Sequence, residues 1–380
     1  VLRICRKGGA LVNGLILGTR ACNLRCKYCF EESMHEGCMQ SVETIRLNFA
    51  DFVDKCLEKY VVELIEINKG LHKTETHITF HGGEPLLVGE ELLRKAFSIV
   101  NKYKNTVISV QTNGTLVTDE YIRLFKEFDV HVGVSLDGPK HMHDAYRKNY
   151  GGAGTYDLIM KNIHDMIENG VIVGALATVT DISVKEPDVF YKFFIDNNLP
   201  FSFNPCFTDP SAKSTYNVLN INEYIEFYKK MFDLWINDNS NNIPISCFER
   251  IISAMAVKKE VWMEVCSFIP DCSKTTVAID TNGDFYRCLH YCMDGLHGIG
   301  NIFKDKLEIA LVDEAMASRW AAIKDSECKN CDIQEYCYGG CPYVAETLNG
   351  TINSKADTCL SQKAIVHYIY SYIKQNYSKK

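Results

Sequence analysis

Residues 15–29, LILGTRACNLRCKYC, join a short apolar run to a loop that carries three cysteines. The run 15–18 has the length and the apolar character of a buried strand. Cys22, Cys26 and Cys29 follow it directly, at spacings typical of metal ligands and not of scattered core residues. The chain contains 17 cysteines and shows no signal-peptide pattern, so we expect reduced thiols that bind metal and not disulfides.

The alternation of strand and helix continues outward from this stretch to about residue 210. Helical periodicity fills the intervals between short apolar runs, which is the pattern of a parallel α/β fold. The predicted strands are 15–18, 76–80, 107–111, 131–136, 171–179 and 201–204. The predicted helices are 42–60, 90–103, 119–128, 156–169 and 187–197.

Glycine-rich and polar motifs follow the predicted strands at the points where the strands end. HGGEP (81–85) follows the second strand, QTNG (111–114) the third and SLDG (135–138) the fourth. Ligands of parallel α/β proteins gather at the carboxyl ends of strands. The cysteine loop and these motifs are therefore expected to form one site.

The composition excludes several classes of partner. The chain has 380 residues and a formal net charge of −7, without a basic cluster that would attract nucleic acid or an anionic membrane. No apolar run reaches the roughly 20 residues that a membrane-spanning helix needs. We expect a cytoplasmic globular protein that binds neither nucleic acid nor membrane.

The three cysteines of the first loop suit an iron–sulfur cluster, for which thiolates are the usual ligands. A cubane has four irons, so three cysteines leave one iron without a protein ligand. Structural zinc normally takes four protein ligands in paired spacings, and here Cys38 is the only further cysteine close enough in sequence to complete such a set. The loop favours a cluster with an open position.

CNLRCKYC, with Tyr28 at its aromatic position, resembles the C-x3-C-x-aromatic-C signature of the radical S-adenosylmethionine (SAM) superfamily. The resemblance implies a partial (β/α)6 TIM barrel in which SAM chelates the open iron. Reduction of the cluster would then cleave SAM to a 5′-deoxyadenosyl radical that abstracts a substrate hydrogen. In such enzymes the protein orients the cofactors and excludes side reactions.

The later loops extend this resemblance. It implies that Gly82 and Gly83 permit a close backbone approach and that Glu84 accepts a hydrogen bond from the SAM ammonium group. A serine suits the ribose hydroxyls and an arginine fork suits the SAM carboxylate. The implied SAM-binding residues are Tyr28, Gly82, Gly83, Glu84, Ser135, Arg147 and Phe207, the last near the adenine.

Eight further cysteines lie in the last third of the chain, which is the number that two fully coordinated four-iron clusters need. They resemble the SPASM extension of radical SAM enzymes, although Cys328 and Cys331 alone would also fit a zinc knuckle. By this resemblance auxiliary cluster I takes Cys266, Cys272, Cys288 and Cys341. Cluster II takes Cys328, Cys331, Cys337 and Cys359.

Six cysteines remain outside these sets. Cys292 lies four residues after Cys288 and is either an alternative ligand or a free thiol near the clusters. The others are expected to be small buried side chains: Cys5, Cys38, Cys56, Cys206 and Cys247.

The chain is expected to divide into four parts. These are a short β extension (1–14), the partial barrel (15–220), linking helices (221–261) and the SPASM domain (262–380). The last part begins with a hairpin, TTVAIDTNGDFYRC, whose turn contains Asn282-Gly283. It ends with an apolar helix, 364–377.

Two enzyme families share this pattern, the anaerobic sulfatase-maturating enzymes and the maturases of ribosomally made peptides. Sulfatase maturases typically carry a catalytic Asp directly after the third auxiliary cysteine, where this chain has Leu289. Leucine cannot accept a proton, and His290 or Asp284 would have to replace that base. The SLDG region resembles the peptide maturases more closely.

We therefore predict an enzyme that abstracts hydrogen from a side chain of a precursor peptide and forms a thioether or carbon–carbon crosslink. It would use SAM, three [4Fe-4S] clusters and a one-electron donor such as flavodoxin or ferredoxin. The alternatives are oxidation of Cys or Ser to formylglycine, and a non-catalytic iron–sulfur electron carrier. A carrier would need neither the HGGEP loop nor Arg147.

Overall fold

The computed structural model describes residues 11–29, 40–206, 219–240, 242–256, 268 and 271–377. Nine strands of this part form one sheet in the order β6-β5-β4-β3-β2-β1-β7-β8-β9. Strands β1 to β6 and β7 run in parallel, whereas β8 and β9 are antiparallel to their neighbours. The strands are β1 Asn13–Leu17, β2 Thr76–His81, β3 Thr106–Thr112, β4 His131–Ser135, β5 Ile172–Val179, β6 Phe201–Pro205, β7 Thr276–Asp280, β8 Asp284–Tyr286 and β9 Gly300–Asn301.

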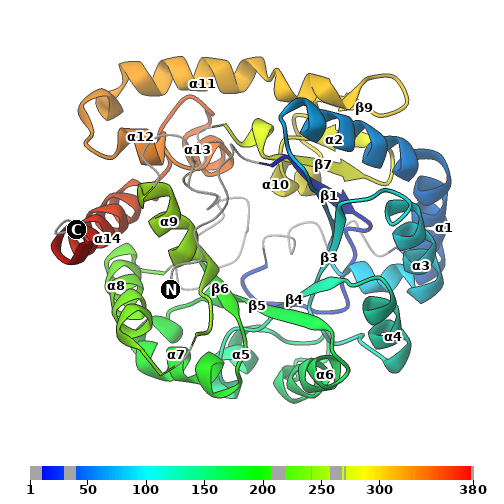
Figure 1. Ribbon diagram of the computed structural model, residues 1–380, viewed down its shortest axis with the longest axis horizontal. Coiled ribbons are helices and arrows are strands. Elements are labelled where there is room, and N and C mark those ends of the chain that lie inside the picture. Colours follow the sequence, from blue (N-terminus) through cyan, green and yellow to red (C-terminus); the bar gives the residue numbers. More distant parts are fainter. Residues whose placement is uncertain are drawn as a thin grey trace.

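The six parallel strands expected from the sequence are confirmed, each with ends within two residues of the prediction. They curve into an arc with helices on the outside, which is a partial (β/α)6 barrel (Figure 1). The barrel helices are α1 Val42–Phe52, α2 Glu58–Gly70, α3 Glu90–Val100, α4 Asp119–Glu127, α5 Lys140–Tyr146, α6 Tyr156–Glu168 and α7 Pro187–Asp196. The later helices are α8 Ile221–Asn237, α9 Ser246–Ala256, α10 Leu289–Asp294, α11 Glu314–Asp325, α12 Gln334–Cys337, α13 Pro342–Asn349 and α14 Cys359–Tyr377.

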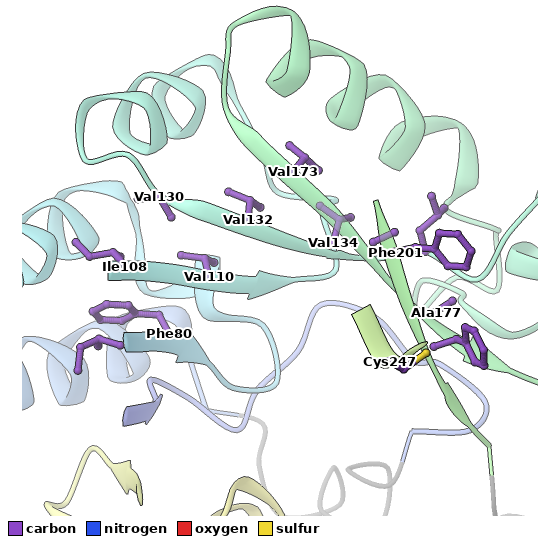
Figure 2. Close-up of a cluster of buried hydrophobic side chains, with 14 of the residues drawn as sticks. Phe80, Ile108, Val110, Val130, Val132, Val134, Val173, Ala177, Phe201 and Cys247 are labelled. Atoms are coloured by element: carbon purple, nitrogen blue, oxygen red, sulfur yellow. The ribbon is translucent and has the colours of Figure 1, made fainter. Parts of the chain in front are cut away.

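Burial alternates along the barrel strands. In β4, Val132 and Val134 are buried, while Gly133 and Ser135, which alternate with them, are half-buried. Successive side chains of a strand point to opposite faces, so the buried set packs under the helices and the half-buried set lines the barrel interior. Figure 2 shows the helix-facing set, which includes Phe80 and Val110.

The first helix is longer than its sequence pattern suggested. The prediction ended it at Tyr60, but α1 continues through a π-helical turn, Val53–Leu57, into α2, which ends at Gly70. Val61, Leu64 and Ile67 carry the buried stripe onward. The prediction was wrong here because charged residues between these apolar positions obscured the helical period.

The cysteine-rich segment begins with the expected hairpin. Gly283 has φ +83° at its turn, a conformation that glycine adopts without strain. Strand β7 pairs in parallel with β1, so this segment extends the barrel sheet by three strands. The Tyr60 hydroxyl of α2 donates a hydrogen bond to the Val277 carbonyl of β7 at 2.7 Å and ties the barrel to this extension.

The last helix, α14, begins five residues before the predicted start at 364, at Cys359. It packs against α8, where the Tyr368 hydroxyl donates a hydrogen bond to Asp233 at 2.7 Å. Figure 1 shows α8 and α14 side by side. Within the described residues, none of the helices is both long and apolar enough to cross a membrane.

Candidate functional site

The cysteine loop leaves β1 and crosses the carboxyl end of the barrel. Its backbone pairs with the segment after α5: Arg25 N donates to Lys148 O at 2.8 Å and Lys27 N donates to Tyr146 O at 3.0 Å. Cys26 is buried, whereas Cys22 and Cys29 are partly exposed. The three sequence-predicted thiols therefore lie on one braced loop at the predicted end of the sheet.

The two glycines of HGGEP press against the start of this loop. Gly83 N donates to Thr19 O at 2.8 Å. A Cβ on Gly82 would lie 2.4 Å from Thr19 O, and one on Gly83 would lie 2.3 Å from Ala21 O. The glycines permit a close backbone approach, as expected, but the approaching backbone is that of the cysteine loop.

Glu84 is fully buried and accepts three hydrogen bonds from the protein. The donors are Leu86 N at 3.0 Å, the Thr112 hydroxyl at 2.7 Å and Asn113 N at 2.7 Å. Burial raises the pKa of Glu84 to about 7, and the three hydrogen bonds oppose that rise. Through these hydrogen bonds Glu84 links the HGGEP loop to the QTNG motif at the end of β3.

Asp137 of the SLDG motif is a buried carboxylate that accepts hydrogen bonds from several groups near Tyr28. It accepts hydrogen bonds from Arg147 Nε at 2.9 Å, Arg147 Nη2 at 3.0 Å and Thr178 N at 2.8 Å, and also from the Tyr28 hydroxyl. The Arg147 guanidinium lies 5.3 Å from the centre of the Tyr28 ring. Sequence reasoning missed Asp137, because the role of an acid inside a turn motif depends on which distant groups reach it.

Asp137 also sets the charge state of this cluster. Burial alone would lower the pKa of Arg147, but the charges of Asp137, Tyr28 and Cys26 and the hydrogen bond to Asp137 together outweigh it, and the pKa is raised well above its usual value. Burial raises the pKa of Tyr28, and Asp137 adds to the effect. Nη1 of Arg147 makes no hydrogen bond within the described residues. It is the one nitrogen of this guanidinium for which the described part of the chain supplies no acceptor.

Ser135 lies at the end of β4 on the interior face of the barrel, where its hydroxyl is 3.4 Å from Gln111 Nε2. His81 lies at the end of β2 and accepts a hydrogen bond from Gly82 N at its Nδ1, 2.8 Å away. Desolvation, with a smaller contribution from the charge of His290, lowers the pKa of His81 to about 4, so the His81 ring is neutral at pH 7. Phe207 and Cys266 lie outside the described residues.

Among the auxiliary cysteines, Cys272, Cys288 and Cys341 form one electrostatic group. Burial raises the pKa of the Cys288 thiol to about 12; N–H groups at the start of α10 oppose that rise, while the charge of Cys341 adds to it. Cys341 lies at the start of α13, where two backbone N–H groups likewise bond its sulfur. Burial lowers the pKa of Arg319, and the charges of Cys341 and Cys272 both oppose this effect.

The remaining four cysteines form a second group. Burial raises the pKa of Cys337 to about 12, and the charges of Cys359, Cys328 and Cys331 raise it too. Cys337 donates a hydrogen bond to Gln362 at 2.8 Å. Cys266 lies outside the described residues, and the assignment of these cysteines to clusters I and II stays a prediction. Within the described residues no three His, Cys, Asp or Glu side chains gather as the ligands of one metal ion would.

The two candidate bases lie in different surroundings. His290 belongs to α10, and its ring stacks on Tyr343 at 4.7 Å. Asp284 begins β8 and accepts a hydrogen bond from Asn301 Nδ2 of β9 at 2.7 Å. Leu289 packs with the apolar cluster under α10 that contains Leu17 and Ala278.

Arg20 links the cysteine loop to α10, a contact that the sequence analysis missed. Its Nη2 donates to the Cys292 carbonyl at 2.7 Å and its Nε to the Met293 carbonyl at 3.0 Å, and Asp280 lies 3.5 Å away. A cation at these carbonyls satisfies the end of the helix. The Cys292 thiol is fully buried. Cys56 and Cys247 are buried as expected, Cys206 is only partly so, and Cys5 and Cys38 lie outside the described residues.

Comparison with known proteins decides the family. A family model described as the radical SAM superfamily matches residues 16–193. A cysteine-type anaerobic sulfatase-maturating enzyme from Clostridium novyi is 30% identical over 336 residues, which are 84% of each chain. The chain belongs to the radical SAM superfamily. Membership implies SAM and a [4Fe-4S] cluster, and the donor set fits them: three thiols on one loop, with an available arginine nitrogen at the same rim.

Other relatives of this radical SAM enzyme support the same family and fold. A serine-type anaerobic sulfatase-maturating enzyme from Bacteroides thetaiotaomicron is 28% identical, covering 84% of this chain and 80% of its own. The structure titled native anSMEcpe with bound AdoMet matches with TM-score 0.80 and 25% identity, covering 97% of this chain and 100% of that one. Streptococcus suis SuiB bound to precursor peptide SuiA, at 16% identity and TM-score 0.63 over 92% and 75% of the chains, shares the fold. The expected fold class, a radical SAM barrel with a cysteine-rich SPASM extension, is confirmed.

We expect Gly83→Ala to prevent stable retention of the first cluster. The new methyl group would overlap the Ala21 and Arg20 carbonyl oxygens, at 2.3 and 2.5 Å, so the cysteine loop must move. Iron content and the visible spectrum after anaerobic reconstitution measure the effect. Gly70→Ala is the matched control, because nothing lies within 4 Å of its Cβ position. Native iron content in Gly83→Ala would contradict this account of the glycines.

We expect Asp137→Asn to lower the free energy of unfolding of the cluster-free protein by about 3 kcal/mol, because it leaves the buried Arg147 charge unpaired. Denaturant unfolding checks the value. Asp157→Asn, which removes an exposed partner of Lys140, should change it little. Equal effects of the two substitutions would show that the Asp137 pair is not a structural requirement.

Proposed function

We propose that this radical SAM enzyme modifies a side chain of a ribosomally synthesised precursor peptide and forms an intramolecular thioether or carbon–carbon crosslink. A peptide or protein substrate is supported by the names of its relatives and by the peptides, Cp18Cys and SuiA, in the titles of similar structures. The crosslink is favoured by one observation, the apolar packing of Leu289 where sulfatase maturases carry their base.

When bound, SAM and its reduced cluster would supply a 5′-deoxyadenosyl radical. In our proposal Cys22, Cys26 and Cys29 hold the cluster, and Arg147 Nη1 binds the SAM carboxylate. Ser135 faces the ribose from the barrel interior, and Glu84 meets the ammonium group once its present hydrogen bonds rearrange. Tyr28, Gly82 and Gly83 keep the loop in place, and Phe207 packs near the adenine.

The crosslink removes two hydrogens from the peptide. One leaves as a hydrogen atom, and the second as a proton and an electron when the new bond forms. We propose two auxiliary clusters as the electron acceptors: cluster I on Cys266, Cys272, Cys288 and Cys341, and cluster II on Cys328, Cys331, Cys337 and Cys359. An external one-electron carrier, such as flavodoxin or ferredoxin, would supply the electron that starts each cycle. The expected domain limits, with SPASM from residue 262, belong to this proposal.

A second candidate function is oxidation of Cys or Ser to formylglycine. The relatives from Clostridium novyi and Bacteroides thetaiotaomicron, both named as sulfatase-maturating enzymes, favour it. It needs a proton acceptor near the substrate, and His290, the residue directly after Leu289 in the sequence, is a candidate.

Replacement of Cys22, Cys26 and Cys29 by Ala should abolish formation of 5′-deoxyadenosine, because no thiolate would remain to hold the SAM cluster. Chromatography of an anaerobic mixture with SAM and dithionite measures the product. Cys247→Ala is the control, since that thiol is buried in the barrel core. Continued SAM cleavage by the triple variant would refute the cluster assignment, and an electron carrier would leave SAM intact even in the native protein.

The two peptide reactions differ in their products. We expect incubation with a candidate precursor peptide, chosen from short reading frames beside the gene, to give loss of two hydrogens, resistance to hydrazide capture, and linked fragments in tandem mass spectrometry. A parallel incubation uses the Cp18Cys peptide, which tests for formylglycine as an aldehyde that a hydrazide captures. An aldehyde on Cp18Cys, with an unchanged precursor peptide, would overturn the crosslinking proposal and establish the second candidate.

A further inference from the structure

Arg319, on α11 in the cysteine-rich segment, is a buried cation with an unusual set of partners. Its side chain is 2% exposed. Nη2 donates to the Gly339 and Gly340 carbonyls at 3.0 Å each, and Nη1 donates to the Ser354 carbonyl at 2.6 Å and to the Ile352 carbonyl. These four carbonyl oxygens accept hydrogen bonds from the two terminal nitrogens of Arg319, but they are neutral and do not compensate its charge.

Arg319 forms no salt bridge within the described residues, in contrast to the other buried arginines. Arg147 pairs with Asp137 at 2.9 Å and Arg287 pairs with Asp313 at 2.6 Å. A buried charge without a counter-charge costs several kcal/mol. A native structure therefore needs negative charge nearby that is not a carboxylate of the described chain.

The partners of Arg319 point to the cysteines on either side of its glycine turn in the sequence as the source of that negative charge. Gly339 and Gly340 separate Cys337, assigned to cluster II, from Cys341, assigned to cluster I. Tyr338, Gly339 and Gly340 have φ of +51°, +82° and +77°, so three successive residues take the left-handed conformation. The Gly339 and Gly340 carbonyls of this turn bond the guanidinium, which also interacts electrostatically with Cys341, Cys272 and Cys337. The guanidinium thus lies at the junction of the two ligand sets.

We propose that Arg319 is the shared counter-charge of the two auxiliary clusters and that it raises their reduction potentials. A [4Fe-4S] cluster with four thiolates carries net negative charge, and reduction adds one more. A buried cation stabilises the reduced form more than the oxidised form, since little solvent screens it. Arg319 would make the clusters better acceptors of the electron that the crosslinking step releases. The inference rests on the two auxiliary clusters of the proposed function.

The test uses the Cys22, Cys26 and Cys29 triple alanine variant as parent, so that only auxiliary clusters contribute. Arg319→Met removes the charge at similar side-chain length. EPR-monitored redox titration should show a shift to lower potential for at least one cluster. Lys324→Met is the matched control, because Lys324 is an exposed cation on the same helix and solvent screens it. Its potentials should equal those of the parent.

Unchanged potentials in Arg319→Met, with both clusters retained, would overturn the proposal. If Arg319→Met loses the clusters, Arg319→Lys decides, because lysine keeps the charge but cannot hold four carbonyls. Clusters retained at parental potential in Arg319→Lys support the charge role. Their complete loss there would show that Arg319 only braces the turn. A parent without auxiliary cluster signals would refute the proposed clusters themselves, and with them this inference.

Discussion

Strand β1 is held on both edges by parallel pairing, with β2 on one side and β7 on the other. Leu15 opposes Thr79 of β2 and Ala278 of β7, so one short strand aligns the barrel with the cysteine-rich extension. The cysteine loop begins where β1 ends, and its direction is therefore set by strands from both parts of the chain. A parallel strand in this position satisfies its backbone hydrogen bonds on both sides, which also makes it rigid.

The loops above this strand are held by backbone and buried charge. Gly83 lies against the cysteine loop so closely that no side chain fits between them. Asp137 then joins Tyr28 of that loop to Arg147 and to β5 through one buried carboxylate. These contacts fix the position of the thiols before any cofactor binds. Preorganisation of this kind lowers the cost of ordering the site around its ligands.

Much of the fold follows from local pattern. Six parallel strands and five barrel helices have periodicities that the sequence displays directly, and the Asn282-Gly283 turn marks the hairpin. The local pattern missed the short helix α5 and two further features. The extension of the first helix to Gly70 depends on packing against the sheet, and the pairing of β7 with β1 joins residues more than 250 positions apart. No local pattern encodes such a pairing.

The sequence by itself determined the cysteine spacing, the strand-then-loop placement of the motifs, and hence the radical SAM family with its cofactor. These are local properties, because a ligand set on one loop or a glycine pair after a strand is written in consecutive residues. Tertiary structure alone decided that Asp137 bonds Nε and Nη2 of Arg147, that Arg20 satisfies the end of α10, and that Arg319 interacts with Cys341, Cys272 and Cys337. Charge compensation in a protein interior depends on which distant side chains share one desolvated space, and only the folded chain specifies that.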